Sequence, residues 1–251
     1  MSSTIRFNEA TWYSLISRSS ANVVGLGNIG SYLAYYLSKS FNHIILIDYD
    51  KIEEHNVSGQ LYLNDQIGEY KADSIKELIQ AMGSECHITL KKCSFSNIDK
   101  KSKSMMKDII FSCVDNMSAR REIFMDFLSN KELNYFIDGR AEAENYHIFI
   151  LSKKEPLFDR QIEYYDSSLF EDASIPDVPC NFKSTPHCGA SIAANMMALA
   201  TNLCYNEKMG TSIMPVPLKM TIHMTFCIQQ LYYMENYLED SKKVELIDVV
   251  C

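Results

Sequence analysis

The chain has 251 residues, a formal net charge of -8 and eight cysteines. This acidic balance disfavours nucleic acid as a partner, because phosphate backbones attract basic surfaces. The length fits one α/β domain with appendages, so we expect a single domain over residues 1–251 rather than two independent ones.

The first informative feature is a glycine-rich turn between a predicted strand and a predicted helix. Residues 22–25 form an apolar run typical of a buried parallel strand, and apolar residues at helical spacing follow over residues 31–37. The turn between them carries Gly25, Gly27 and Gly30. A helix N-terminus here presents amide groups and the positive end of the helix dipole to an anion. The sequence therefore predicts a phosphate-binding turn, of a kind that serves NAD, FAD and ATP alike.

A second predicted strand, residues 44–47, ends in Asp48, eighteen residues beyond Gly30. A carboxylate at this distance binds a ribose hydroxyl in nucleotide-binding α/β folds. Adenylyl transfer from ATP also develops negative charge on the departing phosphates, which Mg²⁺, Lys or Arg must meet. Lys71 is placed to supply part of that positive charge. A bound dinucleotide needs no such cation, so Lys71 favours ATP chemistry.

Two further strands are predicted to end in polar residues. Residues 108–114 form an apolar run that ends in Asp115, and residues 135–137 precede a predicted turn at residues 138–140. Helical periodicity resumes over residues 119–127. In open parallel sheets the ligand crevice lies at the carboxyl ends of the strands, so we expect these polar residues and Asp48 to converge on one site.

The last third of the chain predicts antiparallel strands. Residues 146–151 form an apolar run, and residues 218–226 alternate between apolar and polar side chains, as in a strand with one face in water. Residues 244–250 add a last predicted strand. The expected fold class is α/β, with a mixed, largely parallel sheet of about eight strands flanked by helices.

Taken in order, these blocks resemble the E1-like adenylyltransferases, the family that includes the ThiF, MoeB and HesA proteins. The resemblance covers roughly residues 20–150. It rests on the glycine turn, Asp48-Tyr49-Asp50, Glu54-His55-Asn56, Gln60, Ile67-Gly68 with Lys71, Cys113-Val114-Asp115-Asn116, and Ala119-Arg120. It implies a Rossmann-like E1 adenylation fold, with a nucleotide-binding half over about residues 20–150. A crossover loop and an antiparallel, substrate-side half would occupy about residues 151–251.

The same resemblance implies an activity and its partners. ATP and Mg²⁺ would be the cofactors, and the reaction would adenylate the C-terminal carboxylate of a ubiquitin-like or sulfur-carrier protein or peptide, releasing pyrophosphate. A homodimer is expected. The first residues lack a signal sequence and no segment suits a bilayer, so we expect a cytoplasmic protein without a membrane partner.

The resemblance also assigns residues to roles. Those expected to bind nucleotide are Gly25, Gly27, Asn28, Gly30, Asp48, Asp50, Asn56, Gln60, Lys71 and Asn116. Lys71 would steady the triphosphate and Asp115 would hold Mg²⁺, whereas Arg120 would only brace the loop. The catalytic candidates are Lys71, Asp115 and Arg140, with two cysteines added below.

Two positions depart from the usual family pattern. The block that commonly carries an arginine before its glutamine has Gly59 before Gln60 here, so a cation is missing. The N-terminal signature has Glu9 where an arginine usually stands. Arg6 and Arg140 are the candidates to compensate. A subset of ThiF-like proteins, including ones of mobile elements and phages, resembles this chain at these blocks, so the difference is also consistent with a subfamily trait.

Cys180 and Cys188 flank a proline-containing stretch that resembles the crossover loop of the family. A thiolate there could accept an acyl group from an adenylate, because the adenylate is a strong electrophile. We favour the alternative in which both are small packing residues, since cysteine is often simply buried. Cys113 lies within an apolar run and is predicted to be core. The absence of a CxxC pair argues against a structural zinc ribbon.

Two other function classes are kept as alternatives. The missing arginine at Gly59 would suit a pseudoenzyme, a binding subunit that holds ATP or a partner without turnover. The glycine turn and Asp48 alone would suit an NAD(P)-dependent oxidoreductase. That second alternative leaves Lys71 and the Asp115-Asn116 block without a role.

Overall fold

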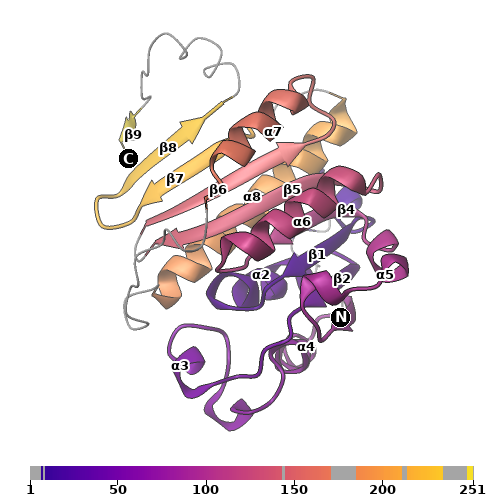
Figure 1. The fold of residues 1–251 in the computed structure, drawn as a ribbon, viewed down its shortest axis with the longest axis vertical. Coiled ribbons are helices and arrows are strands. Elements are labelled where there is room, and N and C mark those ends of the chain that lie inside the picture. Colours follow the sequence, from indigo (N-terminus) through magenta and orange to yellow (C-terminus); the bar gives the residue numbers. More distant parts are fainter. Residues whose placement is uncertain are drawn as a thin grey trace.

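The computed structural model describes residues 7, 9–142, 145–170, 185–210, 214–233 and 248–250. Its centre is a nine-stranded sheet in the order β3-β2-β1-β4-β5-β6-β7-β8-β9 (Figure 1). The strands are β1 (Ser20–Val24), β2 (His43–Ile47), β3 (His87–Lys91), β4 (Asp108–Ser112), β5 (Leu133–Glu142), β6 (Asn145–Ser152), β7 (Lys219–His223), β8 (Ile228–Tyr232) and β9 (Asp248–Val250). The helices are α1 (Tyr13–Ile16), α2 (Asn28–Ser38), α3 (Glu54–Val57), α4 (Lys71–Ala81), α5 (Lys100–Ser104), α6 (Met117–Ser129), α7 (Phe158–Ser167) and α8 (Pro186–Met209), with 3-10 turns at Asn64–Gln66 and Phe95–Asn97.

The first five strands in the chain are mutually parallel, and all of them except the edge strand β3 are buried on both faces of the sheet. In β2, Ile44 and Leu46 belong to one core cluster and Ile45 and Ile47 to the other. Strands buried on both faces read as continuous apolar runs because neither side meets water. The strands β6 to β9 then add to β5 in antiparallel fashion. The predicted mixed α/β sheet, parallel first and antiparallel later, is confirmed.

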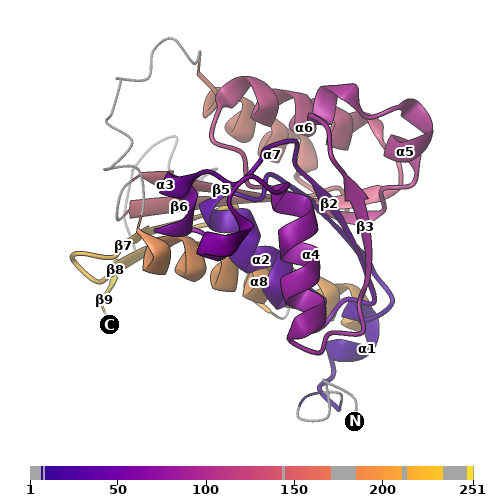
Figure 2. The ribbon, with the colours of Figure 1, turned by 90° about the horizontal axis from the view of Figure 1, so that it is seen from below.

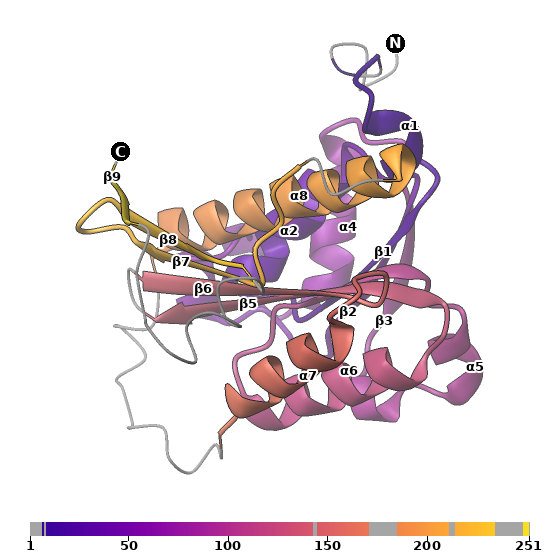
Figure 3. The ribbon, with the colours of Figure 1, turned by 90° about the horizontal axis from the view of Figure 1, so that it is seen from above.

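Helices cover the sheet in two layers (Figure 3). The helices α1, α2, α4 and α8 lie on one face, and α5, α6 and α7 lie on the other. Figure 2 shows α8 beside α2, and their approach is close: the Asn28 Nδ2 atom donates to the Thr185 carbonyl at 3.1 Å. A Cβ added to Gly189 would stand 2.2 Å from the Asn28 side chain. Of the helices in the described ranges, none is both long and apolar enough to cross a bilayer.

Two strands were not predicted from the sequence. In β3, at the edge of the sheet, Ile88 is the one buried residue, and in β8 all five residues are half-buried. Neither strand shows the continuous apolar run of a central parallel strand. The described sheet therefore has nine strands rather than about eight.

The predicted strand over residues 218–226 is shorter and differently exposed than expected. It ends at His223, and a turn at residues 224–227 with Cys227 at φ 52° leads into β8. The expectation that its polar face is wet is wrong at Thr221, which is only 3% exposed and is hydrogen-bonded to His147 Nδ1 at 2.8 Å. Of the predicted last strand, the structure describes Asp248–Val250 as β9, and residues 244–247 lie outside the described ranges.

The predicted turn at residues 138–140 is wrong. These residues lie inside β5, which pairs with β6 so that Asp138 stands opposite Phe149 and Arg140 opposite His147. The glycine between them suggested a turn, but its role is in packing: a Cβ on Gly139 would stand 2.8 Å from the Met196 sulfur in α8. A strand glycine of this kind marks a close approach rather than a chain reversal.

Candidate active site

The register of the parallel strands brings the predicted polar residues to one edge of the sheet. One row of aligned residues crosses four strands: Ile47, Val24 and Ser112 are the last residues of β2, β1 and β4, and Asp138 lies within β5. Asp48 and Gly25 directly follow the first two of these residues, and Asp115 lies three positions beyond Ser112. The glycine turn, Asp48 and Asp115 therefore start from the same edge, as expected for a ligand crevice in an open α/β sheet.

The three glycines of the turn lie in different environments. Gly25 has φ +87°, and a Cβ there would be 2.7 Å from the Cys113 carbonyl oxygen. A Cβ on Gly30 would be 1.8 Å from the Gly25 oxygen. Neither position therefore has room for a side chain. A Cβ on Gly27 would meet nothing within 4 Å, and Gly27 caps the N-terminus of α2. The open space at Gly27 lies at the helix N-terminus, where the helix dipole and backbone amides favour an anion.

Asp48 ties the glycine turn to the end of β2. Its carboxylate accepts the Leu26 amide at 2.6 Å and the Asp50 amide at 2.7 Å. Burial raises the pKa of this carboxyl, and the two amide hydrogen bonds and the charge of Lys71 oppose that rise. Each carboxylate oxygen has a second lone pair, so Asp48 can accept a ribose hydroxyl while it still holds the turn.

Lys71 is the first residue of α4, and its ammonium group lies 2.9 Å from Asp50 Oδ2. The Lys71 side chain is 8% exposed, whereas that of Asp50 is 46% exposed. The Lys71 amide also donates to the Asp50 carbonyl at 3.0 Å. The cation is thus fixed in a buried position, beneath a carboxylate that faces solvent.

Asn56 and Gln60 lie in and just after α3. Asn56 is buried, and its side-chain oxygen accepts the Glu53 amide at 2.9 Å, which caps the helix. The Leu61 amide donates to Ser31 Oγ at 3.2 Å, which ties this segment to α2. Within the described part of the chain, the buried Gln60 Oε1 atom has no hydrogen-bond partner. It is an acceptor that a ligand donor could satisfy.

Asp115 and Asn116 form the exposed end of the loop between β4 and α6. Asn116 caps α6, because its side-chain oxygen accepts the Ala119 amide at 2.7 Å. The Asn116 amide nitrogen reaches Asp115 Oδ1 at 3.4 Å. The carboxylate of Asp115 therefore faces solvent at the carboxyl end of β4, where it is accessible to a cation.

Arg140, the candidate to replace the missing arginine, is bound to protein groups. Its Nε atom donates to Asp138 at 2.8 Å, and its terminal nitrogens donate to the Ser168 carbonyl and hydroxyl oxygens at 2.9 and 3.0 Å. Arg120 is also ion-paired with Asp138, in keeping with the bracing role expected for it. Arg6, the other candidate, lies outside the described residues.

The cysteines fall into different environments. Cys188 is fully buried near the N-terminus of α8, an environment that favours the packing interpretation over a covalent one. Cys113 is buried, as predicted. Cys180 and Cys251 lie outside the described ranges. The six described cysteines are free thiols, and burial raises the pKa of Cys86 and of Cys204 to about 12, which disfavours the nucleophilic thiolate.

Sequence reasoning missed one residue of the site, Tyr62. Its hydroxyl donates to the Leu26 carbonyl at 2.6 Å, while the amide of the same residue donates to Asp48. Burial, and then the charges of Asp48 and Asp50, raise the pKa of Tyr62 well above its ordinary value, so it stays a donor. Its position gave a signal, because Tyr62 lies two residues beyond Gln60, at the end of the block that begins at His55 and Asn56. An aromatic residue at such a position is more often part of the hydrophobic core, so it was not predicted as a site residue.

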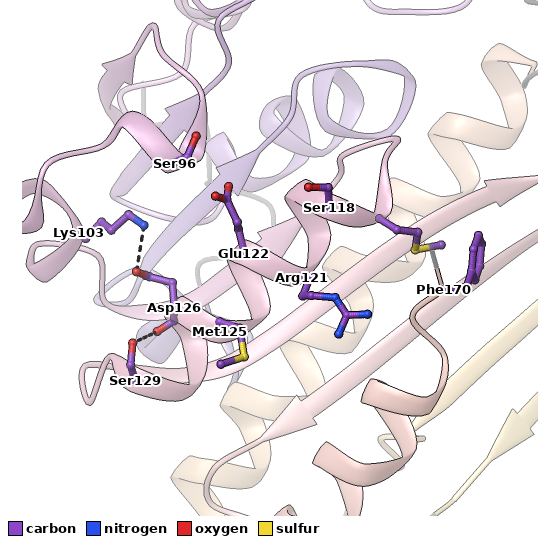
Figure 4. Close-up of a pocket in the computed structure, with 10 residues that line it drawn as sticks. Ser96, Lys103, Ser118, Arg121, Glu122, Met125, Asp126, Ser129 and Phe170 are labelled. Carbon is purple, nitrogen blue, oxygen red and sulfur yellow. Dashed lines mark hydrogen bonds and ion pairs between the residues drawn. The ribbon is translucent and has the colours of Figure 1, made fainter. Parts of the chain in front are cut away.

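A separate pocket of about 660 Å³ lies along the outward face of α6 (Figure 4). Its walls mix charged, hydroxyl and apolar side chains, among them Arg121, Glu122, Met125 and Phe170. It includes none of the residues predicted to bind nucleotide. The glycine turn, the buried Lys71 with Asp50, and the exposed Asp115 lie apart from this pocket, at the shared edge of the parallel strands.

Comparison with known proteins identifies relatives of the whole arrangement. A model of the ThiF family matches residues 4–211. A protein named ubiquitin-like modifier-activating enzyme 5 from Drosophila persimilis is 28% identical over 165 residues, which cover 60% of this chain and 43% of the relative. Its namesake from Culex quinquefasciatus is 28% identical over 157 residues, or 57% of this chain and 39% of the relative. The chain thus spans less than half the length of these relatives.

Solved structures share the fold. Escherichia coli MccB with ATP superimposes with a TM-score of 0.63 at 16% identity, covering 89% of this chain and 66% of MccB. Escherichia coli tRNA N6-threonylcarbamoyladenosine dehydratase, TcdA, in complex with ATP gives a TM-score of 0.63 at 19% identity, covering 83% of this chain and 94% of TcdA. The described sheet and its helices therefore have the Rossmann-type architecture of E1-like adenylation proteins.

Proposed function

The chain belongs to the ThiF family, and on that basis we propose that it is an ATP-dependent adenylyltransferase that activates a carboxylate as an acyl-adenylate. One observation carries the proposal. The glycine turn, the buried Lys71 with Asp50, and the exposed Asp115 all follow strands whose carboxyl ends share one sheet edge. A dinucleotide site would use the turn and Asp48 but would give the other three residues no task.

In this proposal each group of the chain has a defined task. The amides at the start of α2, around Gly27, bind phosphate oxygens. Asp48 accepts a ribose hydroxyl. Lys71 stabilises the negative charge that grows on the departing phosphates, and its fixed position means that little reorganisation is needed as that charge develops. Gln60 offers its buried oxygen to a donor on the nucleotide.

The residues present also fit Mg²⁺. This ion binds through one or two carboxylates together with substrate phosphates rather than in an all-protein cage. Asp115 supplies an exposed carboxylate, and the described residues contain no cluster of three or more His, Cys, Asp or Glu side chains arranged to hold a metal ion. Asp115 would hold the ion against the phosphates, where it would neutralise developing charge.

The reaction follows from these contacts. A carboxylate oxygen of the substrate attacks the α-phosphorus of ATP, so that one oxygen–phosphorus bond forms while the bond to the β-phosphate oxygen breaks. Pyrophosphate leaves with the electron pair of the broken bond. The chain orients the two reactants and stabilises the leaving group. No side chain needs to donate or accept a proton in this half-reaction.

The substrate we propose is the C-terminal carboxylate of a ubiquitin-like or sulfur-carrier protein or peptide. Two similarities support it: the relatives in Drosophila and Culex are named for activating a ubiquitin-like modifier, and MccB has been solved with MccA. We also propose a cytoplasmic homodimer, which light scattering of the purified protein tests. A monomer at all concentrations would contradict the dimer.

The direct test of activity is pyrophosphate release from Mg-ATP in the presence of candidate carrier proteins and peptides with free C-terminal carboxylates. We expect release with at least one carrier and a mass increase of that carrier by one adenylyl group. Amidation of the carrier's C-terminus is the matched control and should abolish both signals. ATP binding without release for every carrier in the panel contradicts the proposal.

A second candidate function is supported by Gly59, where the family usually has an arginine. A pseudoenzyme would bind ATP or a partner without turnover. Gly59→Arg distinguishes the two functions, because restoring the cation should create activity only in a pseudoenzyme. In an active enzyme the variant should leave turnover nearly unchanged or lower it.

A further inference from the structure

Asp138 is a fully buried carboxylate that binds two arginines. It lies in β5, level with the end of β4, and is 0% exposed. Its Oδ1 atom is ion-paired with Arg120, and its Oδ2 atom accepts Arg140 Nε at 2.8 Å and the Tyr165 hydroxyl at 3.0 Å. Buried carboxylates are retained when each oxygen is satisfied in this way.

The first arm of this network runs through Arg120 to the loop that carries Asp115. Arg120 lies in α6 and is 3% exposed. Its second terminal nitrogen donates to the Val114 carbonyl at 2.5 Å, one residue before Asp115. A further contact reaches the Gly139 carbonyl at 3.3 Å. The backbone on one side of Asp115 is therefore fixed by Arg120, and on the other side by the Asn116 cap.

The second arm runs through Arg140 to the C-terminal end of α7. Both terminal nitrogens of Arg140 donate to Ser168, the residue that follows the helix. The guanidinium carbon also lies 4.2 Å from the Phe149 ring centroid and 5.2 Å from that of Tyr165. These contacts fix the plane of the guanidinium, because a stacked and bidentate arginine cannot rotate without losing them.

We propose that Asp138 is a positioning residue, which holds the Asp115 loop through Arg120 and the end of α7 through Arg140. The proposal rests on the proposed function for its link to Mg-ATP. It gives Arg140 a different task from contact with phosphate: its guanidinium bonds are made to Asp138 and Ser168. Asp115 receives its position from Arg120 and Asp138, although neither of these residues touches the ion.

The two arms make separate predictions. Arg120→Lys keeps the charge but loses the fork that joins Asp138 to Val114, so the Mg²⁺ concentration for half-maximal ATP binding should rise about tenfold, as for other losses of a metal ligand's support. ATP affinity at saturating Mg²⁺ should change less than about threefold. Amide exchange should quicken at residues 113–117. Arg140→Lys should instead quicken exchange at residues 165–170 and leave the Mg²⁺ requirement unchanged.

Arg121→Lys is the matched control. Arg121 is the next residue in α6 and makes an exposed ion pair with Asp166 at 3.4 Å, with side-chain exposures of 45% and 60%. It should match the wild type in both readouts. Asp138→Asn should combine both effects if the variant folds, and the two arginine variants keep the test decisive if it does not.

The outcomes separate this proposal from the proposed function. A wild-type protein that binds no Mg-ATP contradicts the function, while exchange at residues 113–117 and 165–170 still tests the network. Wild-type exchange in folded Arg120→Lys and Arg140→Lys overturns the positioning role. A loss of ATP affinity at saturating Mg²⁺ in Arg140→Lys, with unchanged exchange, also overturns it, because that result would mean direct phosphate contact.

Discussion

The parallel and antiparallel halves of the sheet place their polar groups differently. In β2 and β4 both faces are buried under helices, so polar side chains of the site appear only after the strands end, at Asp48 and Asp115. In β6 and β7 one face packs against α8, while the other carries His147 and Thr221 within the strands, beside the buried Phe149 and Leu151. The strands β2 and β4 thus place the polar residues of the site after their ends, whereas β6 and β7 hold polar residues along their length.

Burial shifts the pKa of Asp48 and of His147, one group from each half, in opposite directions. It raises the pKa of Asp48 in the parallel half, where the charged form is the anion. It lowers the pKa of His147 in the antiparallel half to about 4, with the nearby charges of Lys219, Arg140 and His223 adding to the effect. These two groups should therefore contribute to the pH dependence of stability with opposite signs.

The largest effect is expected in the glycine turn of the parallel half. Gly30→Ala should destabilise the fold by about 4 kcal/mol or prevent folding, because the new Cβ would stand 1.8 Å from the Gly25 oxygen. Gly27→Ala is the control for the same change in open space, and it should fold with nearly wild-type stability but bind Mg-ATP more weakly. Chemical denaturation and ATP titration check both. Equal stability of the two variants contradicts the structure of the turn.

Lys71→Met should lower adenylation about 100- to 1,000-fold, the usual loss when one fixed charge-stabilising group is removed. Folding should be little affected, because the partner Asp50 is 46% exposed and can be hydrated once unpaired. Lys92→Met removes another lysine paired with an aspartate, Asp73 at 3.0 Å, and should retain full activity. Pyrophosphate release measures both. Retained turnover in Lys71→Met would remove this residue from the site.

In the antiparallel half, the wild type should lose stability as the pH falls from 6.5 to about 4, the ordinary and folded pKa values of His147. In that window the unfolded chain binds the proton and the folded chain does not, so stability rises with pH. The expected change is about 1–2 kcal/mol after allowance for solvent screening of a partly exposed group. His147→Gln should flatten this slope in urea unfolding. An unchanged slope would mean that His147 titrates normally.

The contribution of Asp48 to folding stability should change with pH in the direction opposite to that of His147. Its folded pKa is raised above 3.8, so the folded chain holds the proton longer and the contribution of Asp48 to stability falls as the pH rises above that value. Relative to Asp48→Asn, the wild type should therefore become less stable with rising pH in this range. The same variant should weaken ATP binding through the ribose. A stability difference that grows with pH in favour of the wild type would contradict the assignment.

The smallest effect is expected at Cys188. Cys188→Ala should cost about 1 kcal/mol, because it leaves a small cavity in the packed start of α8. Adenylate formation should be unchanged, since the buried thiol has no part in the first half-reaction. Urea unfolding and pyrophosphate release measure the two properties. A folded variant that has lost pyrophosphate release would contradict the packing role.

The sequence predicted the central parallel strands β1, β2 and β4 well because their signals are local. The apolar runs at residues 22–25 and 44–47 specify β1 and β2, and the carboxylates after the runs mark the sheet edge. The sequence failed at β3 and β8, whose half-buried residues carry little periodic signal. It also predicted a turn at Gly139. The close approach of Met196, which explains this glycine, joins residues far apart in the chain and leaves no local signal. The roles of the site residues stay predictions.

The contacts of Asp138 with Arg120 and Arg140 could not be predicted from the sequence for a similar reason. Arg120 and Arg140 could each be singled out from motifs, but their shared carboxylate depends on the alignment of β4 with β5 and on the position of α7. No spacing in the sequence encodes that meeting. The sequence therefore suggested Arg140 as a phosphate-binding cation, whereas in the fold it donates to Asp138 and Ser168.

Calorimetric titration of the purified protein with ATP, with and without Mg²⁺, and separately with NAD and NADP, tests the central claim most directly. We expect ATP to bind in a metal-dependent manner, with the metal dependence weakened in Asp115→Asn, and neither dinucleotide to bind. Tight binding of NAD, or ATP binding that ignores both Mg²⁺ and the Asp115 substitution, would contradict an adenylation site at the edge of the parallel strands.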